Sequence, residues 1–320
     1  MKAKCDVLCI GLTNINIMIS PVDKSVFDRD VTLVEEIITV PGGDATNEAI
    51  VLAHLGVSVR LLAKTGRDAF GRQISAALKE NGVETDALIQ SRYDSTSVCA
   101  VLVNPDKSRN FASFRGANET LRLSDIDFNW IKQAKIVCIG SMFALKGLDG
   151  DGVLEILGCC RKEGIITVAD MKADTYHLGP QSLTKIYPYL DYFMPSYEEA
   201  LYLSDKSAPG EMASFFKQSG CRNVIIKLGE KGCYVDTEEF SGMISSFNVN
   251  TVDTTGAGDN FVAGFIAGLL FGFSVKSCAI FGNAVAALSV QKIGAITGNS
   301  STEQVLQFLG KERPEWSKGE

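Results

Sequence analysis

A glycine-rich turn late in the chain has the residue types of an anion-binding catalytic site. Gly256 and Gly258 carry no Cβ atom, so the backbone can bend tightly there and a ligand can approach it closely. The apolar run at residues 261–273 is too long for a typical strand and too short to span a membrane, and it predicts a buried helix. Because the first amides of a helix lack internal partners, the turn predicts an anion site.

Asp259 falls in the first turn of this predicted helix, beside the place where an anion would bind. A carboxylate there would repel a phosphate unless a third group lay between them. In phosphoryl transfer that group is the acceptor hydroxyl, whose proton the aspartate takes while the amides stabilise the transferred group. The alternative is an aspartate that only complements the helix dipole, beside an ordinary glycine turn.

The composition is that of a soluble globular protein. The 320 residues are 46% hydrophobic and 22% charged, enough for one large α/β domain or two smaller ones. A net charge of −7 argues against a nucleic-acid or anionic-membrane surface. The nine cysteines include no C-x-x-C pair, so we expect core residues in a reducing compartment, and two histidines argue against a histidine-based metal site. Polar residues interrupt any signal-peptide core, which predicts a cytoplasmic protein.

Short apolar strands alternate with helical segments along most of the chain. Strands are predicted at residues 6–11, 13–20, 59–64, 97–103, 110–114, 136–140, 165–170, 192–195, 223–228, 233–235 and 246–250, and helices at residues 46–55 and 72–81, besides the one after the glycine turn. This alternation predicts an α/β fold with a doubly wound, mostly parallel sheet. Ligands of such sheets bind beyond the carboxyl ends of the strands, where the glycine turns fall.

Two other segments could contact a ligand. Gly42 and Gly43 form a second glycine turn before a helix, with Asn47 one turn into it; a plain turn with a buried asparagine is the alternative. Asn14 and Asn16 alternate with isoleucines, so one strand face could present both amides. The chain has neither a G-x-G-x-x-G after a strand nor a P-loop, so any phosphate site must be the later glycine turn.

The sequence Asp-Thr-Thr-Gly-Ala-Gly-Asp at residues 253–259 closely resembles the C-terminal signature of the ribokinase-like (PfkB) carbohydrate kinases. The turn with Gly42, Gly43 and Asn47 resembles the N-terminal signature of that family, and further matches follow in the family's order over residues 5–300. The resemblance implies one ribokinase-like α/β domain over residues 1–320, with a small β-sheet lid from about 13–40 and 97–114. It also implies ATP-dependent phosphoryl transfer to a hydroxyl of a small sugar or sugar derivative.

The resemblance assigns a role to each matching residue. Asp259 would be the base that deprotonates the acceptor hydroxyl, and Gly256, Ala257 and Gly258 would supply the amides of the anion hole. The sugar would be held by Asn14, Asn16, Gly42, Gly43 and Asn47. ATP would lie against Ser196, Lys227, Gly229, Gly232 and Asn283. Glu199 would organise Mg²⁺ through water, and Asp253 and Thr255 lie in a loop that binds a monovalent cation such as K⁺ in some relatives.

Two positions depart from the family's pattern. Asn16 stands where the first strand usually carries an aspartate, and an amide donates as well as accepts, whereas a carboxylate only accepts. We expect either a substrate with an acceptor group, such as a carbonyl or carboxylate, toward Asn16, or an ordinary diol bound less tightly. Ser196 stands where the Asn-x-x-Glu motif has asparagine, which affects the metal and nucleotide details.

Several alternatives stay open at this stage. A nucleoside kinase of the same superfamily would need an apolar pocket for the base, and a sugar-sensing pseudokinase would bind without turnover. The sequence has no added basic cluster near the glycine turns, which disfavours a substrate that is already a phosphorylated sugar. Lys172 could contact phosphate and Arg115 could reach the sugar from the lid; a solvated lysine and a surface arginine are the alternatives. The isoleucines of residues 13–20 could meet a second subunit in a homodimer or cover the chain's own core.

Overall fold

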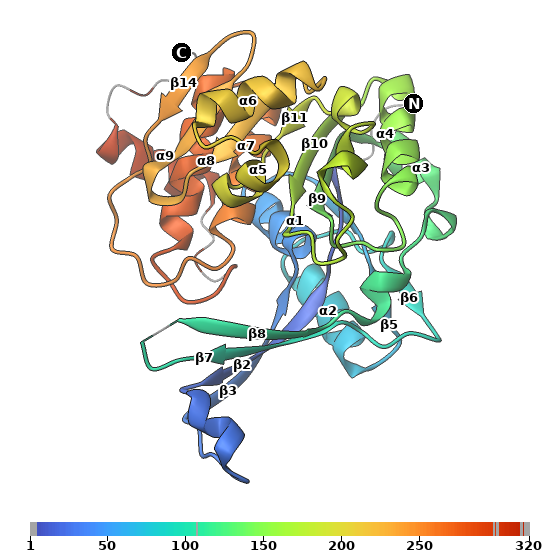
Figure 1. The fold of residues 1–320 in the computed structure, drawn as a ribbon, viewed down its shortest axis with the longest axis vertical. Coiled ribbons are helices and arrows are strands. Elements are labelled where there is room, and N and C mark those ends of the chain that lie inside the picture. The colour runs from blue at the N-terminus through green and yellow to red at the C-terminus, as the bar shows by residue number, and fades with distance from the viewer. Residues whose placement is uncertain (1–4, 107, 297, 299–300, 314–315, 317–320) are drawn as a thin grey trace.

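The computed structural model describes residues 5–106, 108–296, 298, 301–313 and 316, and within them the largest sheet has eight strands (Figure 1). Its order is β14-β13-β12-β11-β10-β9-β1-β4. The strands are β1 (Cys5–Ile10), β4 (Val59–Leu62), β9 (Ala134–Met142), β10 (Ile166–Met171), β11 (Tyr192–Phe193), β12 (Asn223–Lys227), β13 (Cys233–Asp236) and β14 (Ser241–Ile244). The pairs from β4 to β12 are parallel, and β13 is antiparallel to both neighbours, which confirms the predicted mostly parallel sheet.

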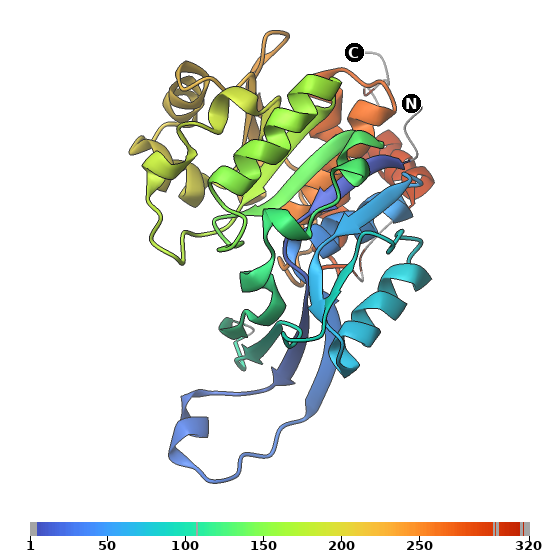
Figure 2. The same cartoon turned by 90° about the vertical axis from the view of Figure 1, so that its right-hand side faces the viewer.

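Successive residues of the central strands enter opposite layers of the core, as the two-residue period of a strand requires. In β1, Val7 and Cys9 belong to one buried cluster, while Leu8 and Ile10 belong to the other. The first layer is formed with α1 (Asp44–His54), α7 (Ala257–Leu270), α8 (Val275–Ser289) and α9 (Thr302–Glu312). The second is formed with α3 (Phe128–Lys132), α4 (Asp151–Glu163), α5 (Tyr197–Ser204) and α6 (Pro209–Gln218). Helices therefore cover both faces, as the alternating sequence predicted (Figures 1 and 2).

A second sheet, which we call the lid sheet, projects away from the central sheet (Figures 1 and 2). Its strands lie in the order β3-β2-β7-β8. They are β3 (Glu36–Gly42), β2 (Asn14–Ser20), β7 (Val98–Val103) and β8 (Arg109–Phe114). The predicted hairpin of β7 and β8 is antiparallel, whereas β2 and β7 pair in parallel. The helix α2 (Ala69–Glu80) contacts β2 and β3 near the base of the lid sheet.

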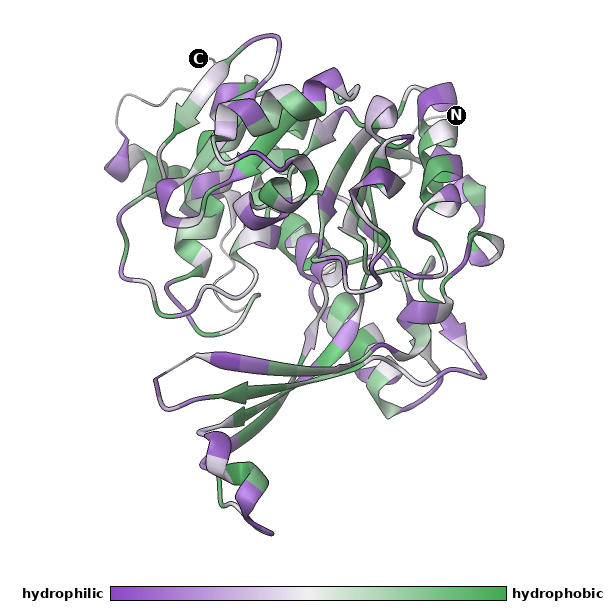
Figure 3. Cartoon of the chain, in the orientation of Figure 1, coloured by the Kyte–Doolittle hydropathy of each residue, from purple (hydrophilic) through white to green (hydrophobic). Residues whose placement is uncertain are grey.

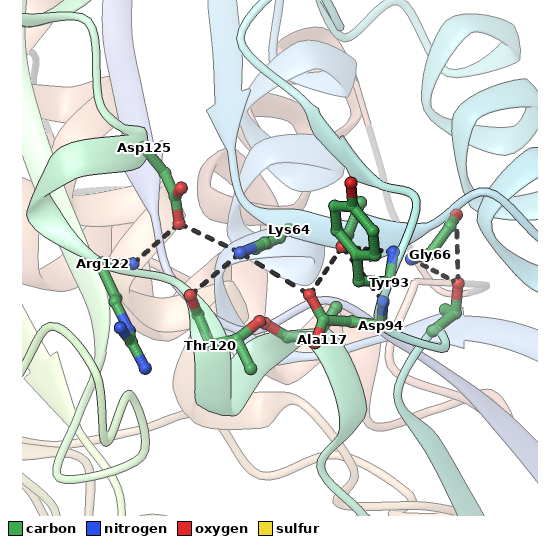
Figure 4. Close-up of polar contacts among 10 residues, drawn as sticks. Lys64, Gly66, Tyr93, Asp94, Ala117, Thr120, Arg122 and Asp125 are labelled. Atoms are coloured by element: carbon green, nitrogen blue, oxygen red, sulfur yellow. Dashed lines mark hydrogen bonds and ion pairs between the residues drawn. The ribbon is translucent and has the colours of Figure 1, made fainter.

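Lys64 anchors the segment that follows β8 (Figure 4). It lies in β5 (Lys64–Gly66), which pairs with β6 (Ile89–Ser91) in a separate sheet, so the strand predicted at residues 59–64 is divided between two sheets. Its ammonium nitrogen lies 2.9 Å from the Thr120 carbonyl oxygen and 3.1 Å from a carboxylate oxygen of Asp125. These bonds fix the short helical turn at Gly116–Thr120.

The strand predicted at residues 246–250 is wrong. Strand β14 ends at Ile244, and the chain from 245 to 250 has no regular structure. The apolar and polar alternation has a different cause, because Phe247 packs edge-on against Phe308 of α9 with ring centroids 5.0 Å apart. A single aromatic anchor in a loop thus gave the pattern of a half-buried strand.

The remaining fold-level expectations concern the cysteines and the membrane. All nine cysteines are free, and seven of them are buried, as expected of small core residues. Among the described residues, the helices are either too short or too polar to cross a bilayer.

Candidate active site

Two pockets meet at the start of α7, because different residues of the same glycine turn line each of them. One pocket, of about 870 Å³, is lined by Ala257 and Gly258; the other, of about 640 Å³, is lined by Gly256 and Asp259. Thr254 lines both. We call the first the nucleotide pocket and the second the sugar pocket, after the ligands that the family resemblance predicts for their residues. A group bound at the amides of this turn can therefore be reached from both pockets.

The conformation of the turn requires glycine. Gly256 precedes α7 with a φ of 71°, and a Cβ atom there would lie 2.5 Å from the Cβ of Ala295. The side-chain amide of Asn260 donates to the Gly256 and Ala295 carbonyl oxygens, at 2.8 Å each, and so fixes the turn. The Ala257 amide donates to the Thr254 carbonyl oxygen at 3.2 Å. Of the three expected anion-hole amides, that of Ala257 is thus engaged within the turn.

Asp259 is buried and faces the sugar pocket. Its carboxylate accepts a 2.6 Å hydrogen bond from the Asn47 side-chain amide. Burial and the nearby Asp44 carboxylate raise the pKa of Asp259 to about 7, against the opposing effects of Lys172 and Asn47. A carboxyl group with a pKa in this range can take a proton from an alcohol at neutral pH and release it afterwards.

The residues predicted to hold the sugar come together in the sugar pocket. It is lined by Asn14, Asn16, Gly43 and Asn47, and Gly42 lies directly against Asn16. A Cβ at Gly42 would lie 2.2 Å from the Asn16 amide nitrogen. Gly43 has a φ of 98°, and a Cβ there would lie 2.4 Å from the Leu12 carbonyl oxygen. Gly42 therefore allows the chain to pass closely behind Asn16, and Gly43 allows it to approach the Leu12 backbone.

The nucleotide pocket is lined by four residues predicted to contact ATP, Lys227, Gly229, Gly232 and Asn283. Lys227 pairs with Asp170 at the end of β10, and a Cβ at Gly258 would lie 3.3 Å from its ammonium nitrogen. Although burial favours neutral lysine, the Asp170 and Glu199 carboxylates raise the pKa of Lys227. A fixed positive charge therefore lies beside the glycine turn.

Ser196 and Glu199 are not among the described residues that line this pocket. They form a capping box at the start of α5: the Glu199 amide donates to the Ser196 hydroxyl at 3.3 Å, and the Ser196 amide donates to the Glu199 carboxylate at 2.7 Å. The serine that replaces the expected asparagine thus stabilises a helix start. Glu199 still acts electrostatically on Asp170 and Lys227.

The carboxylate of Asp253 is hydrogen-bonded and charge-paired by groups of the protein itself. Its carboxylate accepts hydrogen bonds from the amides of Thr255, at 2.7 Å, and Gly294, at 2.8 Å, and it pairs with Arg109 of the lid sheet. The Thr255 hydroxyl is buried without a partner in the described part of the chain. A monovalent cation at this loop stays a prediction.

A model of the pfkB family of carbohydrate kinases matches residues 4–302. The chain belongs to this family. It is 29% identical over 275 residues to a ribokinase of Haemophilus influenzae, covering 84% of this chain and 87% of that one. It also resembles the crystal structure of a ribokinase from Thermotoga maritima, with a TM-score of 0.82, 27% identity and coverage of 95% and 99%. A ribokinase of Arabidopsis thaliana, whose structure contains ribose and ATP, has the same fold, with a TM-score of 0.82, 23% identity and coverage of 97% and 99%.

In this pfkB-family chain, sequence reasoning gave too little weight to the charged residues around the sugar pocket. Lys172 lines the pocket and pairs with Asp44 at 2.8 Å, although 47% of its side chain remains exposed, and Arg115 lines the pocket from the lid side. Asp44, Asp170 and Arg109 were not predicted as site residues. The sequence contained an indication for two of them: Asp44 follows the first glycine turn, and Asp170 lies at the end of a parallel strand, where ligands of such sheets bind.

Proposed function

We propose that the protein is an ATP-dependent kinase that transfers the γ-phosphoryl group to a hydroxyl of a small sugar or sugar derivative. The observation that supports this most directly is that two pockets meet at the α7 N-terminus, with Asp259 facing one of them. In-line transfer needs a donor and an acceptor on opposite sides of one phosphoryl group, and two pockets that share this turn support such an arrangement.

In the proposed reaction Asp259 accepts the proton of the acceptor hydroxyl as that oxygen attacks phosphorus. The amides at the start of α7 stabilise charge on the transferred group, and Lys227 adds a positive charge beside Gly258. Asn47 orients the Asp259 carboxylate through its hydrogen bond. The lid sheet excludes water from the sugar pocket, because water would otherwise compete as the acceptor.

Asp170 and Glu199 fit an Mg²⁺ ion held through water. Burial and the Glu199 carboxylate together raise the pKa of Asp170 to about 6, against the opposing effect of the Lys227 charge. Two carboxylates that repel one another in this way suit a hard cation that keeps part of its water shell. When bound, Mg²⁺ neutralises phosphate charge. Among the described residues no group of three or more histidine, cysteine or acidic side chains could hold the ion directly, in keeping with ligation through water and ATP.

The lining of the sugar pocket disfavours the two alternatives. A nucleobase would need an aromatic or apolar wall, but of the described residues that line the pocket Phe111 is the one aromatic, and its side chain is largely exposed. A pseudokinase would have lost part of the catalytic arrangement, whereas Asp259, Asn47 and Lys227 are all in place.

The test is ADP release from Mg-ATP across a panel of free sugars, sugar acids and nucleosides, with the wild type and with Asp259→Asn. We expect turnover of a sugar or sugar acid, and a decrease in kcat of roughly a thousandfold in Asp259→Asn with substrate binding retained. Asp151→Asn is the matched control, because Asp151 lies in the first turn of α4 and is exposed. A near-normal rate for Asp259→Asn would remove the proposed base, and binding without turnover of any compound would favour the sensor.

We also propose that a second copy of the chain covers the lid sheet. Large apolar side chains are exposed there and in the segment between β2 and β3, namely Phe27, Val31, Leu33 and Ile37. Much of the ribbon of the lid sheet is coloured as hydrophobic in Figure 3. Removing such side chains from water lowers the free energy, which favours association through this surface. Leu33→Asp should lower the molar mass measured by light scattering from that of a dimer to that of a monomer. Leu178→Asp, at an exposed leucine outside the lid sheet, should not; a monomeric wild type would contradict the proposal.

A further inference from the structure

One face of the lid sheet forms one wall of the sugar pocket. The register pairs Asn16 of β2 with Cys99 of β7, and Cys99 with Ser113 of β8, so these three side chains lie in a row across the strands. All three line the pocket. Arg115 follows Ser113 by two residues and also lines the pocket. An amide, a thiol, a hydroxyl and a guanidinium therefore line the pocket on the side of the lid sheet.

Arg115 is held in place by the segment that follows it. Its carbonyl oxygen accepts from the Asn118 amide at 3.1 Å. The Asn118 side chain in turn bonds both backbone groups of Thr13, accepting from the amide at 3.3 Å and donating to the carbonyl oxygen at 2.9 Å. Lys64 also bonds to this segment, through the Thr120 carbonyl oxygen (Figure 4). Together these bonds fix the backbone from which Arg115 extends.

The other cations of the pocket are already paired. Lys172 pairs with Asp44, and Arg109 pairs with Asp253. Arg115 is half-buried, and none of the carboxylates in the described ranges forms an ion pair with it. One uncompensated positive charge therefore remains at the sugar pocket. A partly buried charge without a partner is costly, and a bound anion would remove that cost.

Asn16 presents a donor to the same region. Its side-chain oxygen accepts a 2.7 Å hydrogen bond from the Asn14 amide, so its amide nitrogen is the group left for a ligand. Gly42 provides the space for that nitrogen. An aspartate at this position would offer only acceptors. Arg115 and Asn16 together therefore suit a ligand group that accepts hydrogen bonds and carries negative charge.

We propose that the substrate is a sugar acid whose carboxylate binds to the Arg115 guanidinium and the Asn16 amide, while a hydroxyl of the same molecule lies at Asp259. This inference rests on the proposed kinase function and names its substrate class. A carboxylate carries one negative charge and matches the planar donor edge of a guanidinium. A phosphate dianion would need a second free cation, and the paired state of Lys172 and Arg109 does not supply one. A neutral diol would leave Arg115 uncompensated.

The test compares matched acids and neutral sugars with the full-length protein. The probes are D-gluconate and D-galactonate, their neutral counterparts D-glucose and D-galactose, and D-glucose 6-phosphate, each with Mg-ATP and ADP release as the readout. We expect kcat/KM to be highest for an aldonate. Arg115→Ala should lower kcat/KM for that acid roughly ten- to a hundredfold, chiefly through KM, and lower it much less for the neutral sugars. Arg115→Lys should restore part of the loss.

Asn16→Asp provides a second, opposite readout. A carboxylate beside the substrate carboxylate should repel it, so activity should shift from the aldonates toward the neutral sugars. Arg72→Ala is the matched control, because Arg72 is exposed on α2 and outside the sugar pocket; its kinetics should equal those of the wild type. Arg115→Ala and Asn16→Asp should retain the melting temperature of the wild type, which separates a binding effect from misfolding.

The outcomes separate this inference from the kinase function. If neutral sugars are turned over at least as well as their acids, the inference is overturned and the proposed kinase function is retained. Preference for the sugar phosphate, lost in Arg115→Ala, would replace the carboxylate by a phosphate. If no compound is turned over, the kinase proposal fails, and thermal shifts with D-gluconate and D-glucose then decide: equal shifts, or shifts unaffected by Arg115→Ala, overturn the inference, whereas a gluconate shift that depends on Arg115 supports it.

Discussion

The Asn47 side-chain amide donates a 2.6 Å hydrogen bond to the Asp259 carboxylate, joining two residues 212 positions apart in the chain. Asn47 lies one turn into α1, and Asp259 lies in the first turn of α7. The starts of two helices, each preceded by a glycine turn, therefore meet at one point of the molecule. The bond holds the carboxylate toward the sugar pocket, where its pKa is set by burial and by the charges of Asp44 and Lys172.

The first prediction concerns the pH dependence of catalysis. Since the pKa of Asp259 is raised to about 7 and the base acts in its ionised form, kcat/KM should rise between pH 6 and pH 8 with an inflection near 7. Lys172→Gln removes a charge that lowers this pKa, so the inflection should move to higher pH; Asp44→Asn should move it to lower pH. The pH profile of ADP release measures both. Shifts in the same direction for the two variants would contradict the assignment.

The second prediction concerns the ion pair between Arg109 and Asp253, which ties the lid sheet to the loop before α7. The Asp253 side chain is 2% exposed, so loss of its cation leaves a buried carboxylate held by two amides alone. Arg109→Met should lower the free energy of unfolding by roughly 2 kcal/mol, and Asp253→Asn in the same chain should recover part of it. Denaturant unfolding of the single and double variants measures the coupling; strictly additive changes would show that the pair does not act as a unit.

The third prediction concerns Glu48, a fully buried carboxyl group in α1. Burial and the Asp170, Asp259 and Asp44 carboxylates raise its pKa well above the usual value, and its Oε1 has no partner among the described groups. Because the folded-state pKa exceeds the unfolded one, stability is lost as pH rises above about 4.3. Glu48→Gln should therefore be more stable than the wild type at pH 8, by on the order of 1 kcal/mol, with no difference near pH 4. Glu80→Gln, at an exposed position of α2, is the control for thermal melts at both pH values.

The fourth prediction concerns the space behind Asn16. A methyl group at Gly42 would overlap the Asn16 amide, so Gly42→Ala should raise the KM for the sugar substrate by roughly tenfold or more. Gly158→Ala is the matched control, since a Cβ there meets nothing within 4 Å and Gly158 lies inside α4. That variant should keep the kinetics and gain about 0.5–1 kcal/mol of stability. Equal effects of the two substitutions on KM would show that Gly42 is not needed for the position of Asn16.

The prediction of the fold from sequence succeeded where the pattern was local and repeated. The apolar run of β1 predicted a buried strand, and the structure divides Val7 and Leu8 between the two core layers. It failed at residues 246–250, because the periodicity there comes from one aromatic anchor, Phe247, and not from strand pairing. The prediction also placed Lys64 in the same strand as β4, because a one-residue break between two strands of different sheets does not alter the hydropathy pattern.

The sequence by itself determined the glycine turns, the aspartate beside the second turn and the family, because backbone conformation and short signatures are properties of neighbouring residues. The tertiary structure decided which charges share the site: Lys172 with Asp44, Arg109 with Asp253, and Arg115 with no carboxylate in the described part of the chain. Electrostatic pairing depends on distances between side chains from different elements, and those distances are set only when these elements pack together in the folded chain.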